Sequence, residues 1–472
     1  MAYLMDRFGY IPYLDFFDVN TPGTHLLHYL AGKVFGYTDL SFRIADLTYL
    51  LATLILIVLF MKSFGREIAW FAAIAFGLVY FRGTGMLFQR DYVLILPIAL
   101  AVVSTFGQVP ISRYLRIFLV GALLGIAATI KPQSIIGLPA FVVYEWVEIR
   151  QEGTERWHPI GAGLGLVFLA FAGVFAPVAV TTMTLWYLGA LPSFLDTALN
   201  YWPLYGALTG EAEILSSTNR IAYFARRYTT FGGFFLLLVP AVMGLYLALF
   251  VSDLSSIQKR RAVLLAGLTV VYSLYALIGG KFWTYHWAPF VFFCVMPCSL
   301  CLAPAKGAHR FQAIFPVGVV LICLAPYVVS PTVLISGFTG RSLPHATSAR
   351  VSEISAFLKQ NSRPQDEVQA FDWTGGALHA MLRCGARPGT SFLYDTQFYH
   401  HVSSRYIQGL RRRLISELET RKPRFLIQVG EASSRLKGPN AEAQIDGLHE
   451  LIGKHYRLAQ RGGGYLLYER IE

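Results

Sequence analysis

Charged residues are scarce in this sequence. Of its 472 residues only 14% are Asp, Glu, Lys or Arg, whereas soluble domains average about 25%. The apolar share is 55% and the mean hydropathy is +0.49. Such a composition excludes a string of ordinary soluble domains and indicates a protein that crosses the membrane many times.

Cysteine is also scarce, with five residues in the chain. Four lie inside apolar runs and Cys384 stands alone near the C-terminal end. This pattern excludes a disulfide framework and a paired CxxC metal site, so we predict that these side chains only pack. The sequence likewise shows no secretory signal peptide, internal repeat or low-complexity tract.

Acidic residues are outnumbered, with 28 Asp and Glu against 40 Lys and Arg, for a net charge of +12. In a soluble protein this surplus would suggest nucleic acid. Here much of it lies in short loops between apolar stretches, where retention on the cytoplasmic side explains it better. We therefore predict no nucleic-acid partner.

The apolar stretches have the length of membrane spans. A spanning helix needs about 20 mostly apolar residues, and about ten stretches fit that requirement. They are 43–64, 67–83, 92–109, 114–130, 133–149, 160–185, 230–252, 262–280, 285–303 and 312–335. The predicted fold is mainly α, a polytopic transmembrane helical bundle over residues 43–337.

Two further regions flank this bundle. Residues 1–42 are predicted to form an external N-terminal loop, in which 24–35 has the apolar spacing of a helix lying in the membrane interface. Residues 338–472 are much more polar and alternate strand-like runs, such as 367–371 and 424–429, with amphipathic stretches. We predict there a small extracytoplasmic α/β domain.

The loops set the orientation. One alternate set of loops is basic throughout, which places that set in the cytoplasm by the positive-inside rule. With an even number of spans, the N-terminal loop, the connection 186–229 and the C-terminal domain then share the outer side. We expect an inner-membrane protein whose active site faces the periplasm or exterior.

A few ionisable residues lie at the predicted outer edge of the membrane. They are the carboxylates Asp15, Asp18 and Asp91 and the cations Arg82, Arg90, Lys131 and Lys281. Each alone can serve as an interfacial anchor. Together they fit a site for an anionic lipid headgroup, because Arg and Lys bind phosphate well.

Aromatic and histidine residues accompany these charges. His286 is a candidate for contacting the phosphate or the sugar, and Tyr13, Tyr201 and Tyr205 are candidates for contacting the substrate. The alternative for them is an interfacial aromatic belt. The two adjacent histidines at 400–401 have no third metal ligand at a suitable spacing in the sequence, so we predict no metal site.

Several short motifs resemble membrane glycosyltransferases of the GT-C class. The resemblance is to the bacterial branch that includes protein O-mannosyltransferases, the lipid A aminoarabinose transferase and the lipopolysaccharide-core galacturonosyltransferases, similar to glycosyltransferase family 39. The motifs are 9–22 (GYIPYLDFFDVNTP), the Phe-Gly-(x)6-Arg of 35–43, 89–92 (QRDY), 128–132 (ATIKP), 280–286 (GKFWTYH) and 465–470 (YLLYER).

This resemblance implies transfer of a sugar from a polyprenyl-phosphate donor to a lipid, glycan or protein acceptor on the outer face, by inverting displacement. Arg82, Arg90, Lys131 and Lys281, with His286, would bind the donor phosphate. The base would be an Asp of the first external loop, for which Asp15 is the first candidate and Asp18 and Asp91 are the reserves. The relatives that the chain most resembles generally need no cofactor, although some GT-C enzymes use a divalent metal.

Two other functions remain open at this stage. One is a flippase or transporter of lipid-linked substrates, and the other is an inactive accessory subunit with the same fold. Transporters tend to show inverted repeats and charges near the membrane midplane, whereas the charges here cluster at one edge.

The start of the chain departs from the family pattern. Family members begin with a membrane span, and the base Asp follows it, before the glycine that corresponds to Gly9. We therefore expect an additional upstream span and an upstream Asp in the native protein, with Asp15 a second acidic group near the sugar. If the chain as given is active, Asp15 is instead the expected base.

Overall fold

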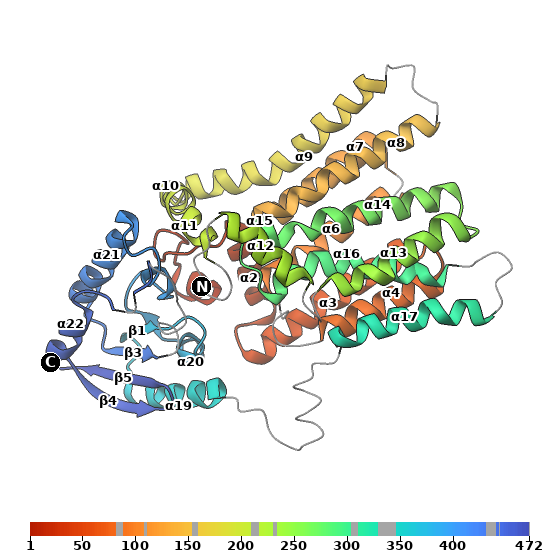
Figure 1. The fold of residues 1–472 in the computed structure, drawn as a ribbon. Coiled ribbons are helices and arrows are strands. Elements are labelled where there is room, and N and C mark those ends of the chain that lie inside the picture. The colour runs from red at the N-terminus through yellow and green to blue at the C-terminus, as the bar shows by residue number, and fades with distance from the viewer. Residues whose placement is uncertain are drawn as a thin grey trace.

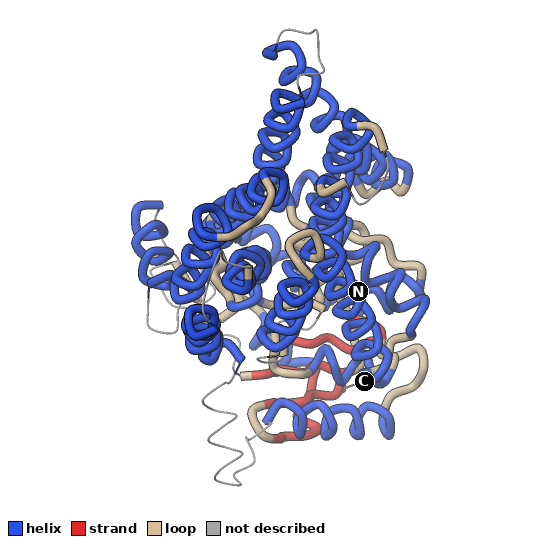
Figure 2. Tube along the Cα trace, turned by 90° about the vertical axis from the view of Figure 1, so that its right-hand side faces the viewer, coloured by secondary structure: helices blue, strands red, loops and turns tan. Residues whose placement is uncertain are grey.

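A helical bundle and a smaller α/β domain make up the fold (Figure 1). The structure is a computed structural model. It describes residues 1–81, 88–107, 111–152, 159–208, 217–229, 234–303, 310–328, 346–430, 440–442 and 444–471. The N-terminus lies between the two parts, and the view turned by 90° shows the strands gathered at one end of the molecule (Figure 2).

Helices occupy all ten predicted spans, which confirms a mainly α fold. The short helices α1 (Ala2–Phe8) and α2 (Pro22–Phe35) come first, and α2 covers the helix predicted at 24–35. The bundle consists of α3 (Asp39–Met61), α4 (Arg66–Tyr80), α5 (Arg90–Val93), α6 (Ile95–Thr105), α7 (Arg113–Ile130), α8 (Leu138–Glu152), α9 (Pro159–Tyr187), α13 (Leu238–Tyr246), α14 (Ser256–Ser273), α15 (Tyr275–Gly279), α16 (Ala288–Ser299) and α17 (Arg310–Val328).

Not every one of these helices is long. Within the described ranges, five segments are long and apolar enough to cross a membrane: Asp39–Met61, Arg113–Ile130, Gly161–Tyr187, Ser256–Gly279 and Thr284–Leu302. Phe235–Val251 and Phe315–Ala325 are shorter apolar helices. The predicted span 92–109 is divided between α5 and α6. The ten predicted spans thus coincide with helices, but only half of them contain a described helix that is long and apolar enough to cross a membrane.

Local sequence signals explain several helix boundaries. The Thr38 hydroxyl accepts a hydrogen bond from the Ser41 N–H (3.1 Å) at the start of α3. Ser255 and Gln258 form a capping box at the start of α14. Small residues bring α7 and α9 together, because a Cβ on Gly121 would lie 2.1 Å from the carbonyl oxygen of Ala170.

Between α9 and α13 the chain forms further short helices. They are α10 (Leu191–Asp196), the π-helical turn Thr197–Tyr201, α11 (Trp202–Ala207) and α12 (Ser217–Thr229). The Trp202 indole donates to the carbonyl oxygen of Val19 at 2.9 Å. This segment therefore covers the N-terminal loop.

The α/β domain has a five-stranded mixed sheet in the order β2-β1-β3-β5-β4. The strands are β1 (Glu367–Phe371), β2 (Arg387–Pro388), β3 (Phe425–Val429), β4 (Tyr456–Gly462) and β5 (Tyr465–Arg470). β1 pairs in parallel with β2 and β3, and β5 pairs antiparallel with β3 and β4. The strands predicted at 367–371 and 424–429 are thus confirmed as β1 and β3.

Helices cover both faces of this sheet. α19 (Ala346–Asn361) and α20 (Ala377–Cys384) pack on one face, and α21 (Arg405–Arg421) and α22 (Leu448–His455) pack on the other. The predicted boundary at 337/338 lies in 329–345, outside the described residues and between α17 and α19.

The α/β domain contacts the N-terminal loop and the bundle directly. The Phe17 N–H donates to the Ser391 carbonyl oxygen at 2.8 Å. His379 and Arg383 of α20 both pair with Asp39 at the start of α3. The domain therefore sits on the end of the bundle where the N-terminal loop lies.

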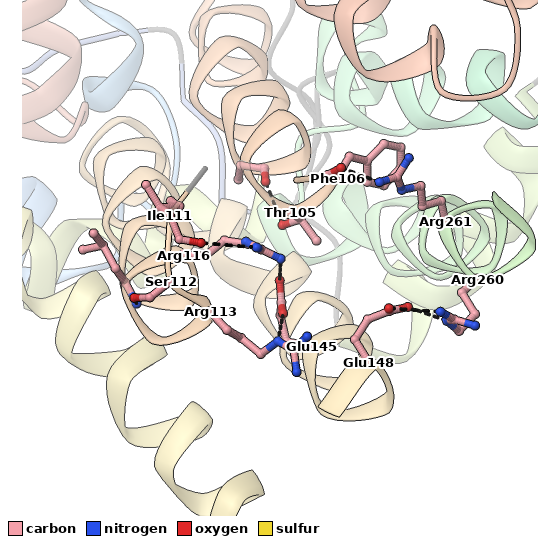
Figure 3. A network of polar contacts seen from close by, with 12 residues as sticks. Thr105, Phe106, Ile111, Ser112, Arg113, Arg116, Glu145, Glu148, Arg260 and Arg261 are labelled. Carbon is pink, nitrogen blue, oxygen red and sulfur yellow. Dashed lines mark hydrogen bonds and ion pairs between the residues drawn. The ribbon is translucent and has the colours of Figure 1, made fainter. Parts of the chain in front are cut away.

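A network of charged residues joins four helices elsewhere in the bundle (Figure 3). The fully buried Glu145 of α8 lies 3.2 Å from Arg113 Nε and 3.4 Å from Arg116 Nη1, both on α7. Glu148 of α8 pairs with Arg260 of α14. Beside it, Arg261 donates to the Phe106 carbonyl oxygen, which connects α14 with the end of α6.

Candidate functional site

A buried carboxylate, Asp91, opens the short helix α5 at the end of the bundle that the α/β domain covers. Its Oδ1 accepts a hydrogen bond from the Tyr275 hydroxyl at 2.8 Å. Its Oδ2 lies 3.9 Å from Lys131 Nζ and 3.7 Å from His286 Nε2. The structure thus brings three of the predicted site residues together from positions far apart in the sequence.

Neither ring nitrogen of His286 has a hydrogen-bond partner in the described part of the chain, although the side chain is 2% exposed. Oδ2 of Asp91 is buried without a hydrogen bond as well. Buried polar groups are normally satisfied. Unsatisfied ones beside a charge cluster indicate a site that a ligand completes.

A second buried carboxylate, Asp18, lies in the N-terminal loop. It accepts hydrogen bonds from the Val19 N–H (2.8 Å) and the Asn20 amide (2.9 Å), and His25 Nε2 lies 3.0 Å from its Oδ2. Asp18 is 1% exposed. Although burial alone would raise it, the pKa of Asp18 is lowered by its pairing with His25, the charge of Arg90 and the hydrogen bond from Asn20, so Asp18 is an ionised carboxylate at neutral pH.

Arg90 connects the two carboxylates. It precedes Asp91 in α5, and its guanidinium is within electrostatic reach of both Asp18 and Asp91. Arg90 also lines a cavity of about 690 Å³, together with Asn20, His25 and Tyr394. A guanidinium at the wall of a cavity can bind an anion there through paired hydrogen bonds.

The N-terminal loop is fixed against the end of α7. The hydroxyls of Thr21 and Thr24 both donate to the carbonyl oxygen of Ile130, the last residue of α7. Gly23 permits this approach, because a Cβ there would lie 2.3 Å from the Thr129 hydroxyl oxygen. Lys131 follows at once, so the same contact places the Asp18 loop beside Lys131.

Burial changes the pKa of Lys131. It lowers the pKa of the Lys131 ammonium to about 8, with the attraction of Asp91 opposing that shift. Lys131 is therefore still mostly protonated at neutral pH and begins to lose its charge just above it.

Lys281 has different surroundings. Its ammonium donates to the carbonyl oxygens of Tyr205 and Leu208 and lies 3.5 Å from the centre of the Tyr205 ring. Burial places the pKa of Lys281 well below its usual range. In the structure Lys281 thus fixes the end of the α10–α11 segment, rather than facing Asp91 as Lys131 does.

The three candidate tyrosines differ in position. Tyr13 is buried against Leu185, Ala190 and Phe194, and its hydroxyl donates to the Asn20 carbonyl oxygen. Tyr201, 1% exposed, is hydrogen-bonded to His400 at 3.0 Å. Both serve packing in this state.

Tyr205 is the tyrosine nearest the charges. Its ring stacks on that of Tyr201, with centroids 5.8 Å apart, and the charges of Arg90, Asp18 and Asp91 all act on its hydroxyl. It borders the part of the site around Arg90 and Asp91, whereas Tyr13 packs against His25, with ring centroids 5.5 Å apart.

The first candidate base, Asp15, lies apart from this site. It is exposed, and its Oδ2 accepts from the Ile11 N–H at 2.6 Å, which closes its own turn. Asp18, a reserve in the prediction, has the buried position. Arg82 lies outside the described residues.

Sequence reasoning missed four residues of this site: Asn20, His25, Tyr275 and Tyr394. His25 was assigned only to the interfacial helix, although it lies close to Asp18 along the chain. Tyr394 comes from the α/β domain and lines the same cavity as Arg90. No local pattern marks it, because tertiary contact alone brings it there.

Within the described residues, no three His, Cys, Asp or Glu side chains are arranged to hold a metal ion. The expectation that the protein needs no cofactor stays a prediction.

The sequence and the structure were compared with known proteins. No family model and no curated protein matches the sequence. Among solved structures, that of ArnT from Cupriavidus metallidurans bound to undecaprenyl phosphate superposes with a TM-score of 0.60 at 13% sequence identity. The match covers 100% of this chain and 92% of that one. The chain has the GT-C glycosyltransferase fold. The predicted GT-C architecture, a helical membrane bundle followed by a small α/β domain, is thereby confirmed.

Proposed function

We propose that this protein transfers a sugar from a polyprenyl-phosphate donor to an acceptor hydroxyl on the outer face of the membrane. The observation that carries the proposal is the buried Asp91, Lys131 and His286 cluster beside Arg90 at the wall of the 690 Å³ cavity. Ionisable groups buried at a membrane edge cost free energy, so their convergence indicates function.

The fold supports the class of donor. The similar ArnT structure has undecaprenyl phosphate bound. In this chain, Arg90 and Lys131 would bind the phosphate of a polyprenyl-phosphate sugar, and His286 would hydrogen-bond it. The acceptor would be a lipid, glycan or protein, and membrane lipids would surround the apolar helices.

The proposed reaction needs cations for the leaving phosphate and an acceptor for the proton of the attacking hydroxyl. The acceptor oxygen attacks the anomeric carbon and forms a new C–O bond, while the bond from that carbon to the phosphate oxygen breaks. Its electron pair leaves with the polyprenyl phosphate, whose added charge Arg90 and Lys131 stabilise. The proton of the acceptor hydroxyl passes to Asp18 through His25, which lines the cavity. Attack opposite the leaving group inverts the anomeric centre.

The experiment is transfer of labelled sugar by the purified, reconstituted chain. Candidate donors are polyprenyl-phosphate sugars, and the acceptor is a lipid extract of cells that lack the gene. Arg90→Ala and Lys131→Ala are each expected to lower kcat/KM for the donor about tenfold or more, or about 1.4 kcal/mol. Lys359→Ala is the matched control, since Lys359 is exposed on α19. Full activity of both site variants would refute this phosphate site.

A flippase or transporter is the first alternative. Alternating access needs helices that separate at both ends of the bundle. The pairs of Glu145 with Arg113 and Arg116, and of Glu148 with Arg260, join α7, α8 and α14 (Figure 3). Separating these helices would leave the buried Glu145 carboxylate without its partners, which is unfavourable and favours an enzyme that keeps this region closed. Movement of the lipid donor across vesicles without sugar transfer would instead establish a flippase.

An inactive accessory subunit is the second alternative. Such a protein would bind the lipid donor through the same cations and produce no labelled product. The buried Asp18–His25 pair favours an enzyme, because lipid binding alone requires no proton acceptor.

A further inference from the structure

The strand order of the α/β domain creates a position at which open sheets commonly bind ligands. β1 lies between β2 and β3 in the parallel part of the sheet. The connection from β1 to β2 runs through α20 on one face, and that from β2 to β3 runs through α21 on the other. Ligands of such sheets bind outside the carboxyl ends of the strands, where the connections change face.

A cavity of about 450 Å³ lies at this position. Asp372, Trp373 and Thr374, which directly follow β1, form part of its wall. Residues of α1, α19 and α20, together with Pro388 of β2 and Leu393 and Tyr394 after it, also line the cavity. It shares Tyr394 and His379 with the 690 Å³ cavity that Arg90 lines. The two cavities therefore adjoin.

The loop after β1 is held rigidly. The Asp372 carboxylate accepts from the Gly375 N–H (2.6 Å) and the Ala377 N–H (2.8 Å), and Arg350 Nη1 donates to the Gly375 carbonyl oxygen at 2.9 Å. Gly376 has a φ of 106°, which favours glycine. Trp373 is thus presented from a fixed backbone, as binding sites require.

The loop also reaches the charged site. The Trp373 ring lies 5.4 Å from that of Trp283, and Trp283 lies 5.5 Å from the ring of His286. Three aromatic rings in sequence thereby connect the wall of the smaller cavity with the Asp91 cluster.

The aromatic part of the lining suits a sugar ring. Trp373 and Tyr394 offer flat aromatic faces for the C–H side of a pyranose, and the Thr374 hydroxyl offers a hydrogen-bonding group to its hydroxyls. His379, also in the lining, is already paired with Asp39. The carboxylate of Asp372 already accepts hydrogen bonds from two backbone N–H groups.

We propose that the 450 Å³ cavity binds a non-reacting sugar unit of a glycan acceptor. The unit that carries the attacking hydroxyl then lies in the adjoining cavity beside Arg90 and His25. This inference rests on the proposed function and specifies its acceptor as a glycan of at least two sugar units.

The experiment measures glycan binding without turnover. Full-length protein in detergent is titrated with monosaccharides and linear tetrasaccharides of glucose, galactose, mannose and N-acetylglucosamine, and binding is followed by saturation-transfer NMR. We expect a tetrasaccharide to bind at least tenfold more tightly than its monosaccharide. Trp373→Ala, and Ala386→Trp, which fills the cavity, should each weaken that binding at least tenfold, and Trp373→Tyr should restore most of it.

Trp186→Ala is the matched control, because Trp186 is 73% exposed on α9. Each variant is first checked for unchanged elution and melting temperature. Failure of all tetrasaccharides to bind, or equal binding by the folded Trp373 and Ala386 variants, would overturn the inference. Binding that depends on Trp373 in a protein without transferase activity would keep the glycan site and refute the proposed function, so the two failures are distinguishable.

Discussion

Two carboxylates three positions apart in the N-terminal loop have opposite surroundings. Asp15 is exposed and closes its own turn, whereas Asp18 is buried against His25 and Asn20. A general base must reach the reacting hydroxyl, directly or through a relay. Asp18 accepts hydrogen bonds from the Val19 N–H and the Asn20 amide. Its partner His25 lines the 690 Å³ cavity, so a proton can reach Asp18 through His25. Asp15 closes its own turn instead.

Asp18→Asn is expected to lower kcat about a hundredfold or more, because a general base typically contributes that much. Asp15→Asn is its control and should keep kcat within about twofold. Both are measured by transfer of labelled sugar, with melting temperature as the check on folding. Loss of activity on the Asp15 substitution alone would return the base to Asp15.

The charge of Lys131 gives a dependence on pH. Since burial lowers the pKa of Lys131 to about 8, the ammonium is present below that pH and is lost as the pH rises through it. The KM for the lipid donor should therefore rise between about pH 7.5 and 9. Lys131→Arg should remove this rise, because arginine stays charged. A KM that rises equally in the variant would show that another group titrates.

At the scale of elements, the start of α5 depends on a carboxylate in a neighbouring helix. Asp46 of α3 is fully buried, and its Oδ1 accepts from the Tyr80 hydroxyl and from the Phe88 N–H at 2.9 Å. Phe88 has a φ of 44°, an uncommon conformation for a residue with a side chain. Asp46 thus holds the backbone two residues before Arg90 and acts as a positioning residue.

Asp46→Ala is expected to raise the donor KM and lower kcat, about tenfold or more in kcat/KM, because a small displacement of Arg90 misplaces its guanidinium. Asp46→Asn keeps an oxygen that accepts from the Phe88 N–H and should restore most of the activity. A purely structural role would lower the melting temperature without this rescue in kcat/KM. Tyr80→Phe, which removes the other donor to Asp46, is the matched control for loss of one hydrogen bond.

At the scale of the whole molecule, the α/β domain lies at one end of the bundle (Figure 1). Trp373 of the domain contacts Trp283, whose ring lies 5.5 Å from that of His286, so the charged site lies at the same end. The contacts of Phe17 with Ser391 and of Asp39 with His379 and Arg383 also connect the domain with the N-terminal loop and the bundle. The side of the membrane that holds the domain is therefore also the side on which the site opens.

A reporter fused after Glu472 should be active only outside the cytoplasm, because the basic loops are expected to stay in the cytoplasm. The measurement uses a phosphatase that folds only outside and a fluorescent protein that folds only inside. The same reporters placed after Lys62 in a truncated chain provide the opposite control. Cytoplasmic activity of the Glu472 fusion would reverse the orientation of the domain and of the site.

The sequence by itself determined the helical membrane bundle, the position of its spans and the strands β1 and β3 of the α/β domain. Hydropathy and periodicity are local properties, so they can be read over about 20 residues for a span and about five for a strand. The motifs that contain Asp91, Lys131 and His286 marked three residues that the structure brings together, since each lies where an apolar helix starts or ends.

The tertiary structure alone decided which of these residues meet and which are used elsewhere. Lys281 donates to carbonyl oxygens more than 70 positions away in the chain, and Tyr201 is buried against His400, 199 positions away. Tyr394 reaches the site from the α/β domain. Such contacts depend on how separate elements pack, and no local pattern of residues encodes them. For the same reason, only the structure shows that Asp18 is buried beside His25 whereas Asp15 is exposed.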